Sequence, residues 1–314
     1  MDPNLQYWKS EGQMFLSRLR VWADLLDPSA LLSSKVEIQN ARATVGSVQT
    51  ISEKDGRAWA LSLSSVHADS GAVLPFAFRP PALLPVSAPL VVASLLPHSG
   101  VQSALFCQFL LQSYMAGFNH ANRNSSSEKA KKMSLKQCLV IAGSVSYTTC
   151  AGALPFILIQ RFAMRSTPVQ FFFRSIVPVP LSAALAFFSV LTVRGEELDN
   201  GVQVFDSNGN SVGVSRAAGA QAVWDTAWSR AALLGTSAAV PNLLVFLLGK
   251  TRLFHKNSLL VAPLRHMSTA LVFGMMIPLS FSIFPQLGTI KKEKLEKKLQ
   301  AAAVDGKLFY HRGL

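Results

Sequence analysis

Long runs without a charged side chain constrain the fold of this chain more than any other feature. Four of them extend over Gln137–Gln160, Ser175–Val193, Ala231–Gly249 and Met267–Ile290, and none contains Asp, Glu, Lys or Arg. A helix of about 20 mainly apolar residues crosses the hydrocarbon core of a bilayer. A buried helix of a soluble protein is usually shorter, and four in one chain are unusual. We therefore expect each run to form one membrane-spanning helix.

A fifth uncharged run, Pro80–Asn122, is long enough for two passes. Prolines cluster near its start, and proline disfavours a regular helix. We expect one span in its second half and a short or re-entrant segment near Ala82–Leu96. The predicted fold class is an all-α membrane protein with about five transmembrane helices, preceded by a small soluble helical N-terminal domain.

The charges are distributed unevenly along the chain. Residues 1–79 carry eight basic and eight acidic side chains, whereas residues 80–314 carry 22 basic and nine acidic ones, which accounts for the whole net charge of +13. Basic loops between apolar spans are typical of membrane proteins, and a nucleic-acid partner is not expected. The predicted parts are a soluble region (1–79), a transmembrane domain (80–290) with a hairpin-bearing loop near 199–216, and a basic tail (291–314).

One apolar helical face is predicted in the N-terminal region. Phe15, Leu19, Trp22 and Leu26 recur at helical spacing, and Asp27-Pro28 ends the helix. This face could pack on the rest of the domain, or it could anchor the domain to a membrane surface. Both interpretations remain open from the sequence.

Four amides follow one face of the predicted span in Val101–Asn122. Gln108, Gln112, Asn119 and Asn122 are separated by four, seven and three residues. Because an amide in hydrocarbon is costly without a hydrogen bond, this stripe should face protein or a water-filled cavity. It could line a site for a zwitterionic substrate, or it could join helices by hydrogen bonds.

A polar turn offers a second candidate site. His67 and Asp69 lie in the sequence His-Ala-Asp-Ser-Gly, where ionisable and hydroxylated side chains come close together. The alternative is a turn held by local hydrogen bonds.

Motifs for catalysis, metal binding and cofactor binding are missing from the sequence. The three cysteines are isolated and the six histidines show no metal-ligand spacing, so we expect neither an enzyme nor a bound metal or cofactor. Asp206–Asn210 resembles a calcium loop, but alternating valines on both sides and Asn208-Gly209 at the tip favour a β-hairpin.

The segment Lys291–Leu299 is rich in lysine and follows the last uncharged run. It is predicted to be a basic helix at the membrane edge. Its lysines could bind anionic lipid headgroups such as cardiolipin, or they could be solvated.

Several motifs, in order along the whole chain, resemble the sideroflexin family. The motifs are Asp27-Pro28 with Leu31-Leu32, His67–Gly71, Gln112-Ser113-Tyr114, Asn119–Arg123, Arg194–Leu198, Asp206–Asn210, Ala262-Pro263, Phe284-Pro285-Gln286 and Arg312-Gly313-Leu314.

The resemblance implies a multi-pass protein of the mitochondrial inner membrane that carries serine and other small neutral amino acids. It also adds Arg123, which ends the Asn119–Arg123 motif, to the candidate substrate-binding residues. Asp2 and Glu11 argue against a cleaved presequence, so targeting information is expected to be internal.

The sequence departs from the family pattern in one membrane segment. Ala186–Leu191 stands where the family has Asn-x-x-Asn-Ile-Pro, so both amides and the proline are replaced. This pattern is similar to a divergent vertebrate branch associated with respiratory complex I assembly and iron–sulfur homeostasis. The alternative function is therefore a non-transporting inner-membrane factor that docks complex I assembly proteins.

Overall fold

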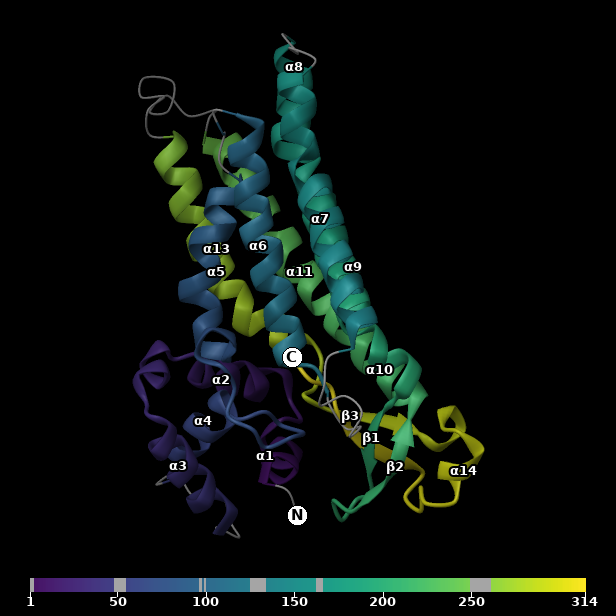
Figure 1. The fold of residues 1–314 in the computed structure, drawn as a ribbon. Helices are drawn as coiled ribbons and strands as arrows, with labels where there is room; N and C mark the ends of the chain where they lie inside the picture. The colour runs from purple at the N-terminus through teal and green to yellow at the C-terminus, as the bar shows by residue number, and fades with distance from the viewer. Residues whose placement is uncertain are drawn as a thin grey trace.

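The uncharged runs form the core of a helical bundle, and the polar parts of the chain gather at one end of it (Figure 1). The computed structural model describes residues 3–47, 55–95, 98, 100–124, 134–161, 166–248 and 261–314. The bundle helices are α5 (Leu83–Leu95), α6 (Val101–Ala121), α7 (Leu135–Arg161), α9 (Pro178–Val193), α11 (Arg216–Leu248) and α13 (Val261–Ile283). A short helix, α8 (Thr167–Phe171), and a π-helical turn, Phe172–Ile176, precede α9.

Four helical segments are long and apolar enough to cross a membrane: Leu135–Arg161, Pro168–Val193, Arg216–Leu248 and Val261–Ile283. Helix α6 has 21 residues, contains no charged side chain and packs between α5 and α7. Helix α5 has 13 residues and is therefore about 20 Å long, shorter than a hydrocarbon core of about 30 Å. The expected class, a helical membrane protein with a helical N-terminal part, is confirmed.

Two expected helix limits are wrong. Helix α11 begins at Arg216, well before the uncharged run that starts at Ala231, and α13 ends at Ile283 while the uncharged run continues to Ile290. Residues Leu287–Lys291 form a strand instead. Absence of charge marks the part of a helix that lies in apolar surroundings, and it does not mark where helical hydrogen bonding starts or ends.

The described N-terminal part is helical, as expected, and its α-helices are α1 (Pro3–Glu11), α2 (Phe15–Leu25), α3 (Lys35–Ser47) and α4 (Gly56–Ser65). Trp8, Trp22 and Trp59 are buried there. The Trp22 ring lies edge-on to Phe281 of α13 at a centroid distance of 5.0 Å. The N-terminal part is therefore packed directly on the end of the bundle.

The small sheet at the same end has four antiparallel strands in the order β2-β1-β4-β3. The strands are β1 (Val202–Phe205), β2 (Ser211–Ser215), β3 (Leu287–Lys291) and β4 (Lys307–His311). The expected hairpin is confirmed: one carboxylate oxygen of Asp206 accepts from the backbone N–H groups of Asn208 and Asn210, and Gly209 adopts φ 82°. A positive φ is accessible to glycine without a Cβ penalty.

The prediction of a basic helix over Lys291–Leu299 is wrong. Lys291 ends strand β3, and a 3-10 turn (Lys292–Lys294) and a short helix, α14 (Lys297–Gln300), follow it. Leu295 and Leu299 are buried against the hairpin strands. These apolar residues hold the segment on the sheet, which a solvated helix would not do.

Candidate functional site

A cavity of about 110 Å³ lies inside the bundle. All six bundle helices contribute to its wall, together with the π-helical turn and His98. Its walls are mainly apolar, with a few polar side chains, which is the usual composition of a small-molecule site. The volume accommodates several water molecules or a small solute.

Two of the expected amides line this cavity. Gln108 and Gln112 lie on successive turns of α6 and are 9% and 6% exposed. A Cβ on Gly152 of α7 would lie 2.6 Å from Oε1 of Gln108. The missing side chain at Gly152 therefore leaves the space that the Gln108 amide occupies.

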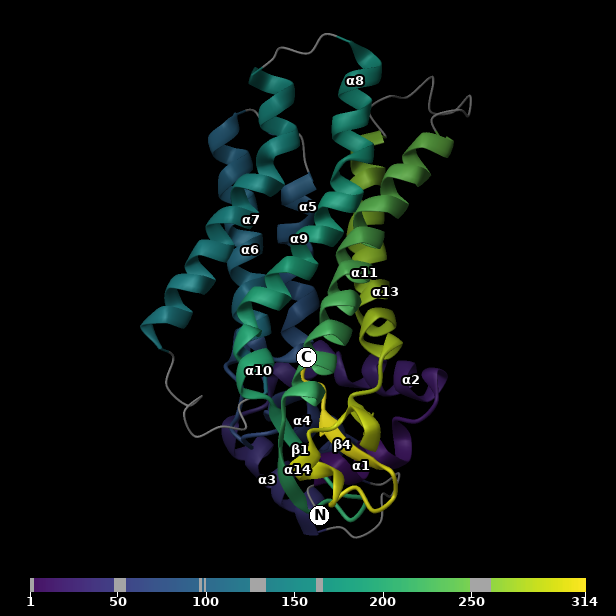
Figure 2. The same cartoon turned by 90° about the vertical axis from the view of Figure 1, so that its right-hand side faces the viewer.

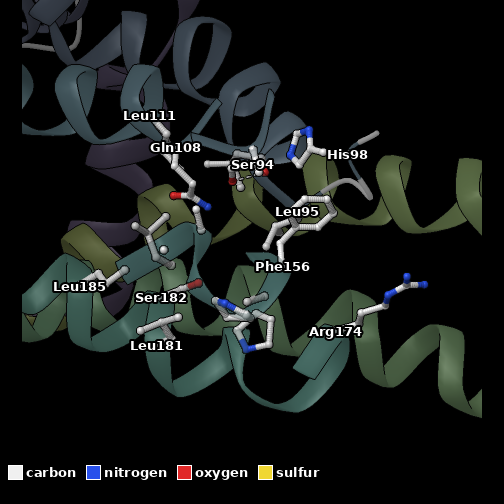
Figure 3. A pocket seen from close by; sticks show the side chains of 18 of the residues that line it. Ser94, Leu95, His98, Gln108, Leu111, Phe156, Arg174, Leu181, Ser182 and Leu185 are labelled. Atoms are coloured by element: carbon white, nitrogen blue, oxygen red, sulfur yellow. Dashed lines mark hydrogen bonds between the residues drawn. The ribbon is translucent and has the colours of Figure 1, made fainter. Parts of the chain in front are cut away.

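Basic side chains border the same cavity farther from the N-terminal part. Arg174, Arg265 and His98 are among its lining residues, and no described lining residue is acidic. Nε of Arg265 and Nε2 of His98 are buried and have no hydrogen-bond partner among the described residues. Figure 3 shows Gln108 and Ser182 pointing toward one another, while Arg174 extends away from them. The Nε donor of Arg265 is therefore available to a solute that carries an acceptor.

Asn119 lies on α6 about 10 Å from Gln112 along the helix axis and does not line the cavity. Its Oδ1 accepts from Nε of Arg230, on α11, at 3.5 Å. The Arg230 guanidinium stacks at 4.3 Å over Phe281 and at 5.6 Å over Phe118. Asn119, Arg230 and the two phenylalanines fill the bundle between the cavity and the N-terminal part. The aromatic rings stabilise the buried positive charge of Arg230.

The other candidates lie where the N-terminal part meets the bundle. Nδ2 of Asn122 donates at 2.9 Å to the Phe78 and Phe118 carbonyls. Nε2 of His67 is 2.6 Å from the Arg123 carbonyl, and Nδ1 of His67 accepts from the backbone amide of Asp69 at 3.2 Å. These bonds fix His67 as the neutral tautomer with its proton on Nε2.

A smaller cavity of about 40 Å³ is bordered by His67 and Asn122. Arg123, beside it, pairs with Glu196 at 3.1 Å. The seven candidate residues therefore do not converge on one cavity: Gln108 and Gln112 line the central one and Asn119 contacts Arg230, whereas Asn122, Arg123, His67 and Asp69 belong to the junction.

Comparison with known proteins identifies the family. The family model described as Sideroflexins matches residues 2–314. The chain belongs to the sideroflexin family. This sideroflexin is 53% identical to Sideroflexin-4 of Danio rerio and 37% identical to Sideroflexin-4 of Bos taurus, with all of each chain covered. It is 27% identical to human Sideroflexin-5 over 99% of this chain and 94% of that protein. No solved structure matches.

Sequence reasoning missed the basic residues of the cavity in this sideroflexin. Arg174 directly precedes one uncharged run, and Arg265 lies two residues before another. A charge beside an uncharged run predicts a position in a loop, but both arginines lie within helical segments that are long and apolar enough to cross a membrane. Among the described residues, no group of His, Cys, Asp and Glu is arranged to hold a metal.

Proposed function

We propose that this sideroflexin carries small neutral amino acids across the mitochondrial inner membrane and binds them in the central cavity. The observation that carries the proposal is a cavity among spanning helices whose polar wall consists of two amides, two hydroxyls, a histidine and two arginines. A carrier requires such a space within the bilayer, whereas a scaffold can be packed solid. The sideroflexin family and the multi-pass architecture support the membrane setting.

The chemistry of the wall suits a zwitterion. The amide oxygens of Gln108 and Gln112 can accept hydrogen bonds from an ammonium group without adding net charge. The guanidinium of Arg265 can bind a carboxylate. Because no described lining residue is acidic, a second positive charge on the substrate would have no counter-charge, which disfavours lysine-like solutes.

Uptake by purified protein in liposomes tests the proposal directly. We expect uptake of labelled serine that exceeds uptake of lysine, and strong loss of serine uptake in Gly152→Val. The matched control is Gly143→Val on the same helix, because a Cβ at Gly143 meets nothing within 4 Å. Gln112→Leu should also reduce uptake, whereas Gln102→Leu changes an exposed residue of the same helix and should not.

Absence of uptake for all small amino acids by folded protein would refute the carrier. The alternative, a factor that supports complex I assembly without transport, would then be favoured. It predicts that complex I assembly proteins co-purify with the chain from mitochondria. It also predicts that Gly152→Val leaves this co-purification unchanged.

A further inference from the structure

Three consecutive apolar side chains at the start of α2 are exposed. Met14 is 73% exposed, Phe15 42% and Leu16 74%. Farther along α2, Val21, Trp22 and Leu25 are each at most 7% exposed, whereas Leu19 is half-buried and Ala23 is exposed. The protein therefore covers apolar side chains in the second half of this helix, and it leaves those at its start exposed.

The guanidinium of Arg18 fixes the position of this apolar tip relative to the bundle. Its Nε donates to the Ser282 carbonyl at 2.9 Å, and its Nη1 donates to the Gly12 and Gln13 carbonyls at 3.2 and 2.9 Å. Ser282 lies in the last turn of α13. The turn that leads into α2 is thus tied to the end of a spanning helix.

The exposed surface of α13 leads to the same place. Met267, Leu271, Met275 and Ile283 are 72%, 65%, 55% and 41% exposed. Because each step of four residues turns about 40° around an α-helix, they form an exposed side that winds by about 160° from Met267 to Ile283. A spanning helix presents such a side to lipid. This lipid-facing stripe ends at Ile283, beside the residue that Arg18 binds.

The direction of α2 fits an interfacial helix. Figure 2 shows α2 lying across the end of α13, whereas α13 runs along the bundle. Helices that lie in the plane of the membrane insert apolar side chains at the boundary between headgroups and acyl chains. Arg20, exposed and four residues after Leu16, is placed on the same side to meet lipid phosphates.

We propose that Met14, Phe15 and Leu16 insert into the bilayer at the headgroup boundary, continuous with the lipid-facing stripe of α13. The partner of this tip is lipid, and the N-terminal helices are held on the membrane by direct lipid contact as well as by packing. This inference does not depend on whether the chain transports a substrate.

Site-specific quenching by nitroxide lipids tests the proposal on the full chain. Leu16→Cys is made with Cys107→Ala, Cys138→Ser and Cys150→Ala, labelled with a polarity-sensitive fluorophore, and reconstituted in phosphatidylcholine vesicles that contain a nitroxide near the headgroup. Val304→Cys is the matched control, because Val304 is 89% exposed and lies in the tail beyond the sheet strand β3.

We expect the label at position 16 to be quenched at least about twofold more than the label at 304, with a blue-shifted emission. Met14→Cys provides a second position in case Leu16→Cys does not fold. Equal quenching at 14, 16 and 304 would overturn the proposal. A blue-shifted label that lipid nitroxides do not quench would also overturn it, because protein would then cover the tip.

Discussion

At the scale of single residues, two arginines at the cavity have no acidic partner among its described lining residues. Arg265 is half-buried, and its Nε donor has no hydrogen-bond partner among the described residues. Burying such a donor costs free energy unless an anion or a water molecule binds it. Arg265 therefore has a chemical reason to bind the substrate carboxylate.

Replacing Arg265 by glutamine should weaken serine binding. A charge-assisted hydrogen bond contributes about 1.5–3 kcal/mol, so the KM for serine uptake should rise by roughly 10- to 100-fold. Arg161→Gln is the control, since Arg161 is exposed at the end of α7 and does not line the cavity. An unchanged KM in Arg265→Gln would assign this arginine a role other than carboxylate binding.

His67 gives the junction a dependence on pH. Burial lowers the pKa of His67 below its ordinary value, more than the hydrogen bond to Arg123 raises it. The unfolded chain then binds a proton that the folded chain does not, so stability is lost as pH falls from about 6.5 toward the folded pKa. Above about 6.5 this histidine contributes no pH dependence.

His67→Gln should remove this part of the acid sensitivity. A glutamine amide can still donate to the Arg123 carbonyl, but it does not titrate. The measurement is the thermal unfolding midpoint in detergent at pH 7.5 and pH 5.5, for the native chain and the variant. A difference between the two pH values that is the same in both proteins would contradict the assignment.

At the scale of elements, the corner between α10 (Gly195–Asn200) and β1 depends on a glycine. Gly201 adopts φ 77°, and a Cβ there would lie 2.7 Å from the backbone carbonyl of Ser215. The hairpin strand β2 can therefore approach this corner only because Gly201 has no side chain.

Gly201→Ala should destabilise the sheet end of the molecule by about 1–3 kcal/mol, through backbone strain and a contact that only backbone movement can relieve. Gly56→Ala provides the comparison, because Gly56 starts α4 and a Cβ there meets nothing within 4 Å. Urea unfolding should show a lower midpoint for Gly201→Ala and an unchanged or slightly higher one for Gly56→Ala.

At the scale of the whole molecule, a buried ion pair between Arg194 and Glu197 is the centre of a hydrogen-bond network. The network joins segments that are distant in the sequence. Nη2 of Arg194 donates to Glu197 at 2.6 Å and to the Arg312 carbonyl at 2.7 Å, and its Nη1 donates to Thr226 of α11 at 2.9 Å. Nδ2 of Asn124 donates to the same Glu197 carboxylate at 2.9 Å. The ends of α6 and α9, the helix α11 and the tail therefore share one buried network.

Arg194→Met should lower the free energy of unfolding strongly, because it leaves the Glu197 carboxylate buried without a counter-charge. The expected loss of stability is about 3–5 kcal/mol. Arg123→Met removes the partner of Glu196, and it should cost less than Arg194→Met, because the Glu196 side chain is 35% exposed and stays hydrated although that of Arg123 is only 7% exposed. Similar losses in both variants, measured by denaturation in detergent, would contradict a structural role for the Arg194 network.

The sequence alone determined that this chain is a helical membrane protein, because uncharged runs of spanning length leave hydrocarbon as their only stable surroundings. It also determined the hairpin, whose turn chemistry is local, and the burial of Gln108, Gln112 and Asn119 on α6. Each of these follows from neighbouring residues and their periodicity.

Only the tertiary structure decided which amides share a cavity, where the tail goes and what covers α2. Gln108 lines the cavity in the space that Gly152 of α7 leaves opposite it, whereas Asn119 meets Arg230. The tail becomes a strand because β1 presents an edge to Lys307–His311. These outcomes depend on pairs of residues far apart in the chain, and no local pattern encodes which distant side chain will lie opposite.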